Sequence, residues 1–261
     1  MTRVLIFGAS HVAQVSMAFY GLKSRNLLPA DLHVDFLSAP GPIIGRLKVA
    51  GPFLTVVEKP ATWPDLSLPA KTFDEWYELV RTRVTAISGG DAIDLKTYDA
   101  VFFIGGQLLS RWHSIDKAQA AGVYSRGCLE QLCTDIILRS HFFKCLNQED
   151  ASVETCKIMS CFEPIQSELL PEYQDFRQDV GHFSQTHDLL RTAAAGLGFE
   201  ILAFPMELLN EAGNAVSVTY HNGRDGDYGH LNPEGGSYIL RSMLQAVPGL
   251  GDAKVPLLAF G

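Results

Sequence analysis

A buried strand that ends in a glycine and passes directly into a helix constrains the fold of this chain most. The run RVLIFG (residues 3–8) is apolar and rich in β-forming residues, and Gly8 stops it. The segment that follows, ASHVAQVSMAFYGLKSR, has apolar residues at a spacing compatible with a helix. A strand, a tight turn and a helix in this order are typical of the first unit of a parallel α/β sheet.

The rest of the chain continues this alternation. Strands are predicted at 33–38, 98–106, 153–161, 199–205 and 215–220, with a hairpin over 46–59 that turns at Gly51-Pro52. Helices are predicted at 72–84, with Thr72 as N-cap, and at 125–147, 183–197 and 233–247. We therefore predict an α/β fold with a doubly wound, mostly parallel sheet and helices on both faces. Ligand chemistry then belongs at the carboxyl ends of the strands.

The length and composition of the chain bound its organisation. It has 261 residues, of which 47% are hydrophobic, enough to bury a substantial core in one domain. The sequence shows no internal repeat, low-complexity tract or clear linker. We predict a single domain over residues 1–261, with a helical insertion over about 110–195 that forms either a cap or a dimer surface.

Charge, hydropathy and cysteine usage exclude several classes of protein. The formal net charge of −8 argues against a nucleic-acid partner. No apolar span of about 18 residues predicts a membrane helix, and the N-terminal segment lacks the features of a secretory signal, so a cytoplasmic location is expected. The 5 cysteines are odd in number and form no C-x-x-C pair, which disfavours a disulfide framework or a zinc site and predicts small buried side chains.

Ser10 is the candidate nucleophile. It lies two residues after Gly8, where the first predicted strand turns into the first helix. Its hydroxyl would project over the carboxyl edge of the sheet, and its N–H would lie at a helix N-terminus that favours developing negative charge. The alternative is that this serine is an ordinary N-cap. A dinucleotide-binding turn is disfavoured, because GASHVA supplies one of the three glycines that such a turn needs.

The segment DYGHLNPEGG near the end of the chain supplies the partners of this serine. Asp227 and His230 form a D-x-x-H pattern after the last predicted strand, on a loop that opens at the same edge as Ser10. His230 would act as general base, and Asp227 would hold the tautomer of its ring. The alternative is a plain helix entry with Asn232 as N-cap and Pro233 at the first helical position, which leaves the D-x-x-H pattern unexplained.

These blocks resemble those of the SGNH/GDSL hydrolases, in which a serine follows the first strand and Asp-x-x-His precedes the last helix. The resemblance follows nearly the whole chain in order and spacing. It implies a three-layer, flavodoxin-like fold, no metal or organic cofactor, and an oxyanion hole built by the Ser10 N–H, Gly41 and Gln107. The sequence departs from the family pattern at Ala9, where an acid is usual, at Gln107 in place of asparagine, and at Leu108 in place of aspartate.

The sequence therefore predicts a serine esterase that hydrolyses a small O-acyl ester through a Ser-His-Asp triad and an acyl-enzyme. An acyltransferase that uses the same triad is one alternative. The other is a catalytically silent α/β protein that binds a small molecule or carbohydrate, and the replacement of asparagine by Gln107 is its motivation. The expected partner is a small-molecule ester, and a homo-oligomer stays open.

Four further histidines are candidates for site residues. His221 follows a predicted strand and is the main rival to His230 as general base. His11 is interpreted as a solvated helix start rather than a substrate contact. His182 and His187 lie five apart on a polar segment, which does not match metal-ligand spacing on one helix face and predicts a solvated surface.

Overall fold

The computed structural model describes residues 1–39, 41–63, 71–105, 115, 118–119, 121–140, 143, 145, 158–161, 183–211, 216–222, 230–251 and 255–258. The main sheet has four strands, all parallel, in the order β2-β1-β6-β7. These strands are β1 (Thr2–Gly8), β2 (Leu32–Ser38), β6 (Ala100–Ile104) and β7 (Ile158–Cys161). The central strands β1 and β6 are almost completely buried, which is typical of a parallel sheet covered on both faces. The predicted α/β class is confirmed.

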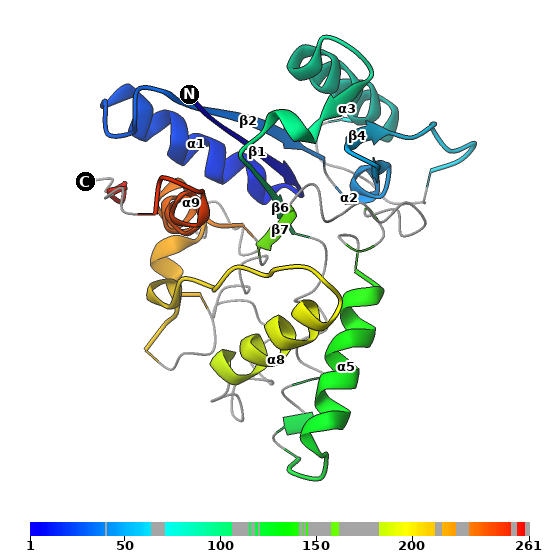
Figure 1. The fold of residues 1–261 in the computed structure, drawn as a ribbon, viewed down its shortest axis with the longest axis vertical. Coiled ribbons are helices and arrows are strands. Elements are labelled where there is room, and N and C mark those ends of the chain that lie inside the picture. Colours follow the sequence, from blue (N-terminus) through cyan, green and yellow to red (C-terminus); the bar gives the residue numbers. More distant parts are fainter. Residues whose placement is uncertain are drawn as a thin grey trace.

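The strand order reverses at β1, and this reversal locates the site. The chain passes from β1 through α1 (His11–Ser24) to β2, and then crosses back to β6 on the other side of β1. Right-handed connections in opposite directions lie on opposite faces of a sheet. Figure 1 shows α1 and α9 (Pro233–Ala246) on one side of the strands and α3 (Phe73–Ser88) on the other. The carboxyl ends of β1 and β6 therefore form the point at which such folds bind ligands.

A second, antiparallel sheet of three strands precedes β6. It consists of β3 (Leu47–Ala50), β4 (Phe53–Val56) and β5 (Ala92–Asp94), and the short helices α2 (Gly41–Ile44) and η1 (Leu95–Thr97) flank it. Ala50 pairs with Phe53, so Gly51 and Pro52 form the turn that the sequence predicts. Gly51 has a φ of 54°, a left-handed conformation that suits glycine.

Helix α3 begins as predicted and extends four residues beyond the predicted end. The Thr72 side chain accepts a hydrogen bond from the Glu75 N–H, and the Glu75 carboxylate accepts from the Thr72 N–H. This reciprocal pair is a capping box, and it satisfies two donors at the helix start. Gly89 ends the helix in the left-handed conformation, with a φ of 75°.

The middle of the chain contributes both to the main sheet and to a helical pair. Helices α5 (Arg126–Leu138) and α8 (Phe183–Gly196) pack against each other (Figure 1), while β7, between them in sequence, pairs with β6. Helix α5 ends nine residues before the predicted end, and the Ser140 N–H closes its last turn on the Ile137 carbonyl. Cys128 on this helix is exposed, so the prediction that the cysteines are buried is wrong for that residue.

The predicted strand at 199–205 is wrong. Its residues are mostly apolar and largely buried, but only Ile201 forms a β-bridge, and side chains of α8 bind part of the backbone where a neighbouring strand was expected. The Phe204 N–H donates to His187 Nε2 at 2.9 Å, and Arg191 Nε donates to the Ile201 carbonyl at 3.1 Å. Because a buried backbone needs hydrogen-bond partners of any kind, side chains can replace a strand here.

The predicted strand at 215–220 is also wrong in most of its length. Val216 forms an isolated bridge with Leu209, and Val218–Tyr220 form the 3₁₀ helix η7. The Ser217 side chain caps η7 by accepting from the Thr219 N–H, which diverts the backbone from strand geometry. A further 3₁₀ helix, η6, spans Met206–Leu208. In the described part of the chain, no helix is both long enough and apolar enough to cross a membrane.

Candidate active site

The turn between β1 and α1 is anchored to both neighbouring strands. The Ala9 N–H donates to the Ile104 carbonyl of β6 at 2.8 Å, and the Gly8 carbonyl accepts from the Ala39 N–H after β2 at 2.8 Å. Gly8 has a φ of 138°, and a Cβ at this position would lie 2.0 Å from the Ile104 carbonyl oxygen. Only glycine fits both the conformation and the space, so the backbone that leads to Ser10 is held rigidly.

The side chain of Ser10 is directed to a histidine from the other end of the chain. Ser10 Oγ lies 2.6 Å from His230 Nε2, although the two residues are 220 positions apart. Ser10 makes no side-chain cap to α1, and its own φ and ψ, −54° and −28°, are already helical. Ser10 therefore occupies the N-cap position of α1, but its side chain does not cap the helix. Both side chains are half-buried, which leaves the pair accessible from solvent.

The start of α9 positions His230. The Asn232 side chain accepts from the Gly235 N–H at 2.8 Å, and Pro233 occupies the first turn, so the predicted helix entry is confirmed. Helix α9 also packs closely on α1, because a Cβ on Gly236 would lie 2.7 Å from the Gln14 carbonyl oxygen. The helix entry and the Ser10 contact therefore coexist. The Asn232 cap sets where α9 begins, and the close packing of α9 on α1 places His230 beside Ser10.

His221 supports His230 and does not replace it. The His221 side chain is 4% exposed, and its Nδ1 lies 3.0 Å from the His230 carbonyl oxygen. The Asn222 N–H donates to the same oxygen at 3.1 Å. The histidine that is hydrogen-bonded to the Ser10 hydroxyl is His230, so the structure does not favour His221 as the rival base.

Two other histidines differ from their predicted surroundings. His11 is buried, 8% exposed, and its ring centroid lies 5.1 Å from that of His230, so the prediction of a solvated helix start is wrong. His187 is also buried, and burial lowers its pKa to about 4, so the predicted solvated surface is wrong there. His182 lies outside the described residues.

The remaining predicted site residues are only partly located. Gly41 is the first residue of α2, three residues after Ser38, whose partner on β1 is Gly8. Asp227 and Gln107 lie outside the described residues, so their roles stay predictions. Among the described residues, no group of three or more His, Cys, Asp or Glu side chains is arranged to hold a metal ion.

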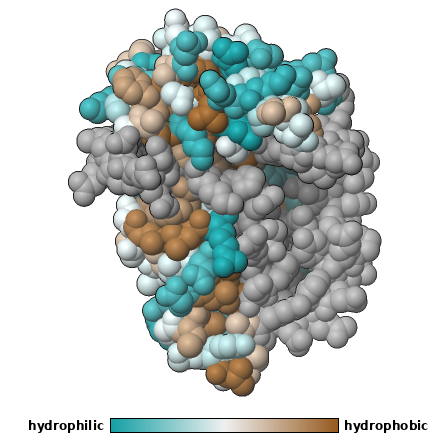
Figure 2. All heavy atoms as spheres, turned by 90° about the vertical axis from the view of Figure 1, so that its right-hand side faces the viewer, coloured by the Kyte–Doolittle hydropathy of each residue, from teal (hydrophilic) through white to brown (hydrophobic). Residues whose placement is uncertain are grey.

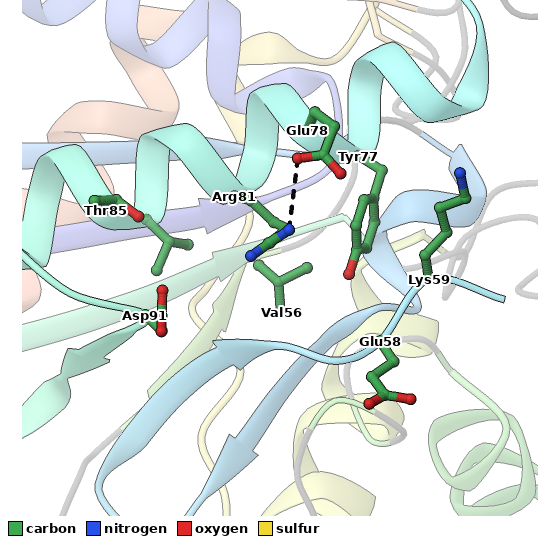
Figure 3. A pocket seen from close by; sticks show the side chains of 9 residues that line it. Val56, Glu58, Lys59, Tyr77, Glu78, Arg81, Thr85 and Asp91 are labelled. Atoms are coloured by element: carbon green, nitrogen blue, oxygen red, sulfur yellow. Dashed lines mark ion pairs between the residues drawn. The ribbon is translucent and has the colours of Figure 1, made fainter.

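A cavity of about 430 Å³ lies apart from this site, between α3 and the end of β4 (Figure 3). Its two basic groups form pairs with neighbours: Lys59 Nζ lies 2.8 Å from Asp74 Oδ2, and Arg81 Nη1 lies 3.6 Å from Glu78 Oε2. Figure 2 shows that the face around α3 is mostly hydrophilic. Exposed pairs of this kind are screened by water, and the mixed charges select no ligand of one sign. The cavity therefore does not compete with the serine–histidine pair as the candidate active site.

Comparison with known proteins identifies no family for this chain. No protein-family model matches the chain, and no curated protein matches it in sequence. Among solved structures, the chain has a weak similarity to the lipase Lip_vut3 from a goat rumen metagenome, with a TM-score of 0.37 and 9% identity over 97% of this chain and 100% of that one. A similarity this low carries no conclusion about fold or activity.

Proposed function

We propose that this protein is a serine hydrolase of carboxylic esters, with Ser10 as nucleophile and His230 as general base. The 2.6 Å contact between Ser10 Oγ and His230 Nε2 is the observation that carries the proposal. A serine hydroxyl is a weak nucleophile until an adjacent base accepts its proton. The absence of a side-chain cap at Ser10 supports the same role, because the hydroxyl is directed to the base and not to its own helix.

The proposed reaction has two half-reactions. Ser10 Oγ attacks the acyl carbon while His230 Nε2 takes its proton, and the tetrahedral intermediate then expels the alcohol, which receives that proton. Water repeats the sequence on the acyl-enzyme, releasing the carboxylic acid and restoring Ser10. The Ser10 N–H lies at the start of α1, where first-turn donors lack partners within the helix, and this supports its use as an oxyanion donor.

The finer features of the proposal come from the sequence resemblance. We assign the protein to the SGNH type, with Asp227 orienting His230, and with Gly41 and Gln107 completing the oxyanion hole. A small O-acyl ester is the proposed substrate. An acyltransferase would share the first half-reaction and use an acceptor hydroxyl in place of water, so product analysis with and without added alcohols separates the two activities.

A fluorophosphonate probe tests the nucleophile directly, because it forms a stable adduct only with an activated serine. Wild type should gain one adduct by intact mass, and peptide mapping should place it on Ser10. Ser10→Ala should gain none. Ser16→Ala is the matched control, since Ser16 lies on the same helix and donates only to the Ala13 carbonyl in the described structure. No adduct on wild type would contradict the proposal and favour a binding protein.

The base is tested by His230→Gln, which keeps a polar side chain of similar size but cannot shuttle a proton. Loss of general base catalysis should slow Ser10 labelling and the hydrolysis of a short-chain aryl ester by roughly 10²–10⁴-fold. The melting temperature should change little, because His230 is only half-buried. Undiminished labelling in this variant would remove His230 from the mechanism.

A further inference from the structure

His221, a buried histidine that contacts the backbone of His230, has no role in the reaction proposed above. His221 is 4% exposed, and its Nδ1 lies 3.0 Å from the His230 carbonyl oxygen. A carbonyl oxygen only accepts hydrogen bonds, so Nδ1 of His221 must carry the proton. The tautomer of His221 is therefore dictated by the backbone of the residue that contacts the candidate nucleophile.

The contact belongs to a clamp that holds the chain on both sides of His230. The Asn222 N–H also donates to the His230 carbonyl, at 3.1 Å, and His221 forms an antiparallel bridge with Leu231. One residue further, the Asn232 N–H donates to the Tyr220 carbonyl at 2.8 Å, and Asn232 Nδ2 donates to the Thr219 carbonyl at 2.7 Å. Residues 219–222 thus bind residues 230–232 through successive hydrogen bonds. Figure 1 shows this part of the chain beside the start of α9.

Within this clamp, His221 Nδ1 is a side-chain atom that binds the backbone of His230, whereas Asn222 binds the same carbonyl through its backbone N–H. The carbonyl oxygen that His221 binds is two covalent bonds from the Cα of His230, so the contact fixes the position of the backbone from which the ring projects toward Ser10. A misplacement of about 1 Å can cost about 10² in rate. A shift of this backbone would move His230 Nε2 relative to Ser10 Oγ.

We propose that His221 is a positioning residue of the active site: its Nδ1–H holds the His230 carbonyl so that His230 Nε2 faces Ser10 Oγ. The inference rests on the proposed function, in which that pair performs the chemistry. It also gives a role to a buried histidine, whose Nδ1–H donates to the His230 carbonyl.

A pair of substitutions at residue 221 tests the hydrogen bond separately from the packing. His221→Asn keeps an N–H donor at the place of Nδ1, whereas His221→Leu puts a methyl group there. Ser10 labelling by the fluorophosphonate should be within about threefold of wild type in His221→Asn, and roughly ten- to one-hundredfold slower in His221→Leu. Circular dichroism and melting temperatures establish that each variant is folded.

The outcomes separate the inference from the proposed function. Equal labelling of wild type and His221→Leu overturns the positioning role and leaves the hydrolase intact. Equal loss in both folded variants shows that the imidazole itself is needed, which overturns positioning by donation and restores His221 as a base. No adduct on wild-type Ser10 removes the proposed function and the inference with it.

A measurement on the unmodified protein covers the case in which His221→Leu does not fold. Long-range ¹H–¹⁵N spectra of the histidine rings report which nitrogen carries the proton. We expect the Nδ1–H tautomer for His221, with the resonance assigned by its loss in His221→Asn. A neutral His221 protonated only at Nε2 cannot donate to the His230 carbonyl and would overturn the inference.

Discussion

Ser10 both starts helix α1 with its backbone and contacts the candidate general base with its side chain. Its φ and ψ begin helix α1, while its hydroxyl leaves the helix to contact His230 at 2.6 Å. This combination depends on Gly8, which ends β1 in a conformation that no other residue adopts readily. The position of the Ser10 hydroxyl therefore depends on the backbone conformation of Gly8, two residues earlier.

Substitution of Gly8 tests that dependence. The Cβ of Gly8→Ala would lie 2.0 Å from the Ile104 carbonyl oxygen, at a φ of 138°. Backbone strain and steric overlap together should lower the free energy of unfolding by about 3 kcal/mol or more, measured by urea denaturation. Gly90→Ala is the control, because a Cβ there meets no atom within 4 Å, and its stability should stay close to that of wild type. A stable Gly8→Ala variant would show that the turn after β1 is not constrained as described.

At the scale of elements, the contact of α1 with α9 brings the two ends of the chain together. The sequence Gly235-Gly236 interrupts a helix with two residues of poor helix propensity, which is a signal of close packing. Each glycine faces a different neighbour: a Cβ on Gly235 would lie 2.8 Å from the Tyr220 carbonyl oxygen, and one on Gly236 would lie 2.7 Å from that of Gln14. This pair therefore joins α9 both to the His221 clamp and to the helix that begins at Ser10.

Gly236→Ala should push α9 away from α1. We expect a loss of about 1–3 kcal/mol in stability and roughly tenfold slower labelling of Ser10, because His230 moves with the start of α9. Gly196→Ala in α8 is the matched control. No atom lies within 4 Å of a Cβ there, so this change should leave labelling unaffected and stabilise the protein by about 0.4–1 kcal/mol. Labelling at the wild-type rate in Gly236→Ala would separate helix packing from the active site.

His187 links α8 to the segment after it and makes stability depend on pH. Burial, and then the positive charge of Arg191, lower the pKa of His187 from 6.5 to about 4. Above pH 6.5 the residue is neutral in both states. Between about pH 6.5 and 4 the unfolded chain binds the proton and the folded protein does not. The free energy of unfolding therefore decreases as the pH is lowered through this range, by up to about 3 kcal/mol.

The variant His187→Gln isolates this contribution. Glutamine keeps an acceptor for the Phe204 N–H but does not titrate. Urea unfolding at about pH 7 and about pH 4.5 should therefore show a smaller loss of stability in the variant than in wild type. The same loss in both proteins would assign the pH dependence to other groups.

At the scale of the whole molecule, the segment around 110–195 is tied into the fold at two places. Strand β7 pairs with β6 at the end of the described strand order, and His187 and Arg191 of α8 bind the backbone of residues 204 and 201. Unfolding of the segment would therefore remove a strand from the main sheet. We therefore retain the prediction of a single domain over residues 1–261 and expect one cooperative transition, with fluorescence and circular dichroism midpoints that coincide. An early, separate transition would show that the segment is an independent unit.

The sequence by itself determined the local features of this protein. Apolar runs, a capping box at Thr72, the Gly51-Pro52 turn and the Asn232-Pro233 helix entry all act between residues that are close in the chain. The strands predicted at 199–205 and 215–220 failed because apolar composition does not reveal whether a strand, an α8 side chain or a local serine binds the backbone.

The D-x-x-H pattern pointed to His230 as the partner of Ser10, and only the tertiary structure decided between it and His221 and placed the other histidines. The surroundings of His11, His187 and His221 were not predictable from the sequence, because their burial depends on neighbours that are distant in the chain. Ser10 and His230 are 220 residues apart, and their contact exists because glycines let β1 meet β6 and α9 meet α1 at close range. Such approaches depend on the packing of the whole chain, which no local pattern encodes.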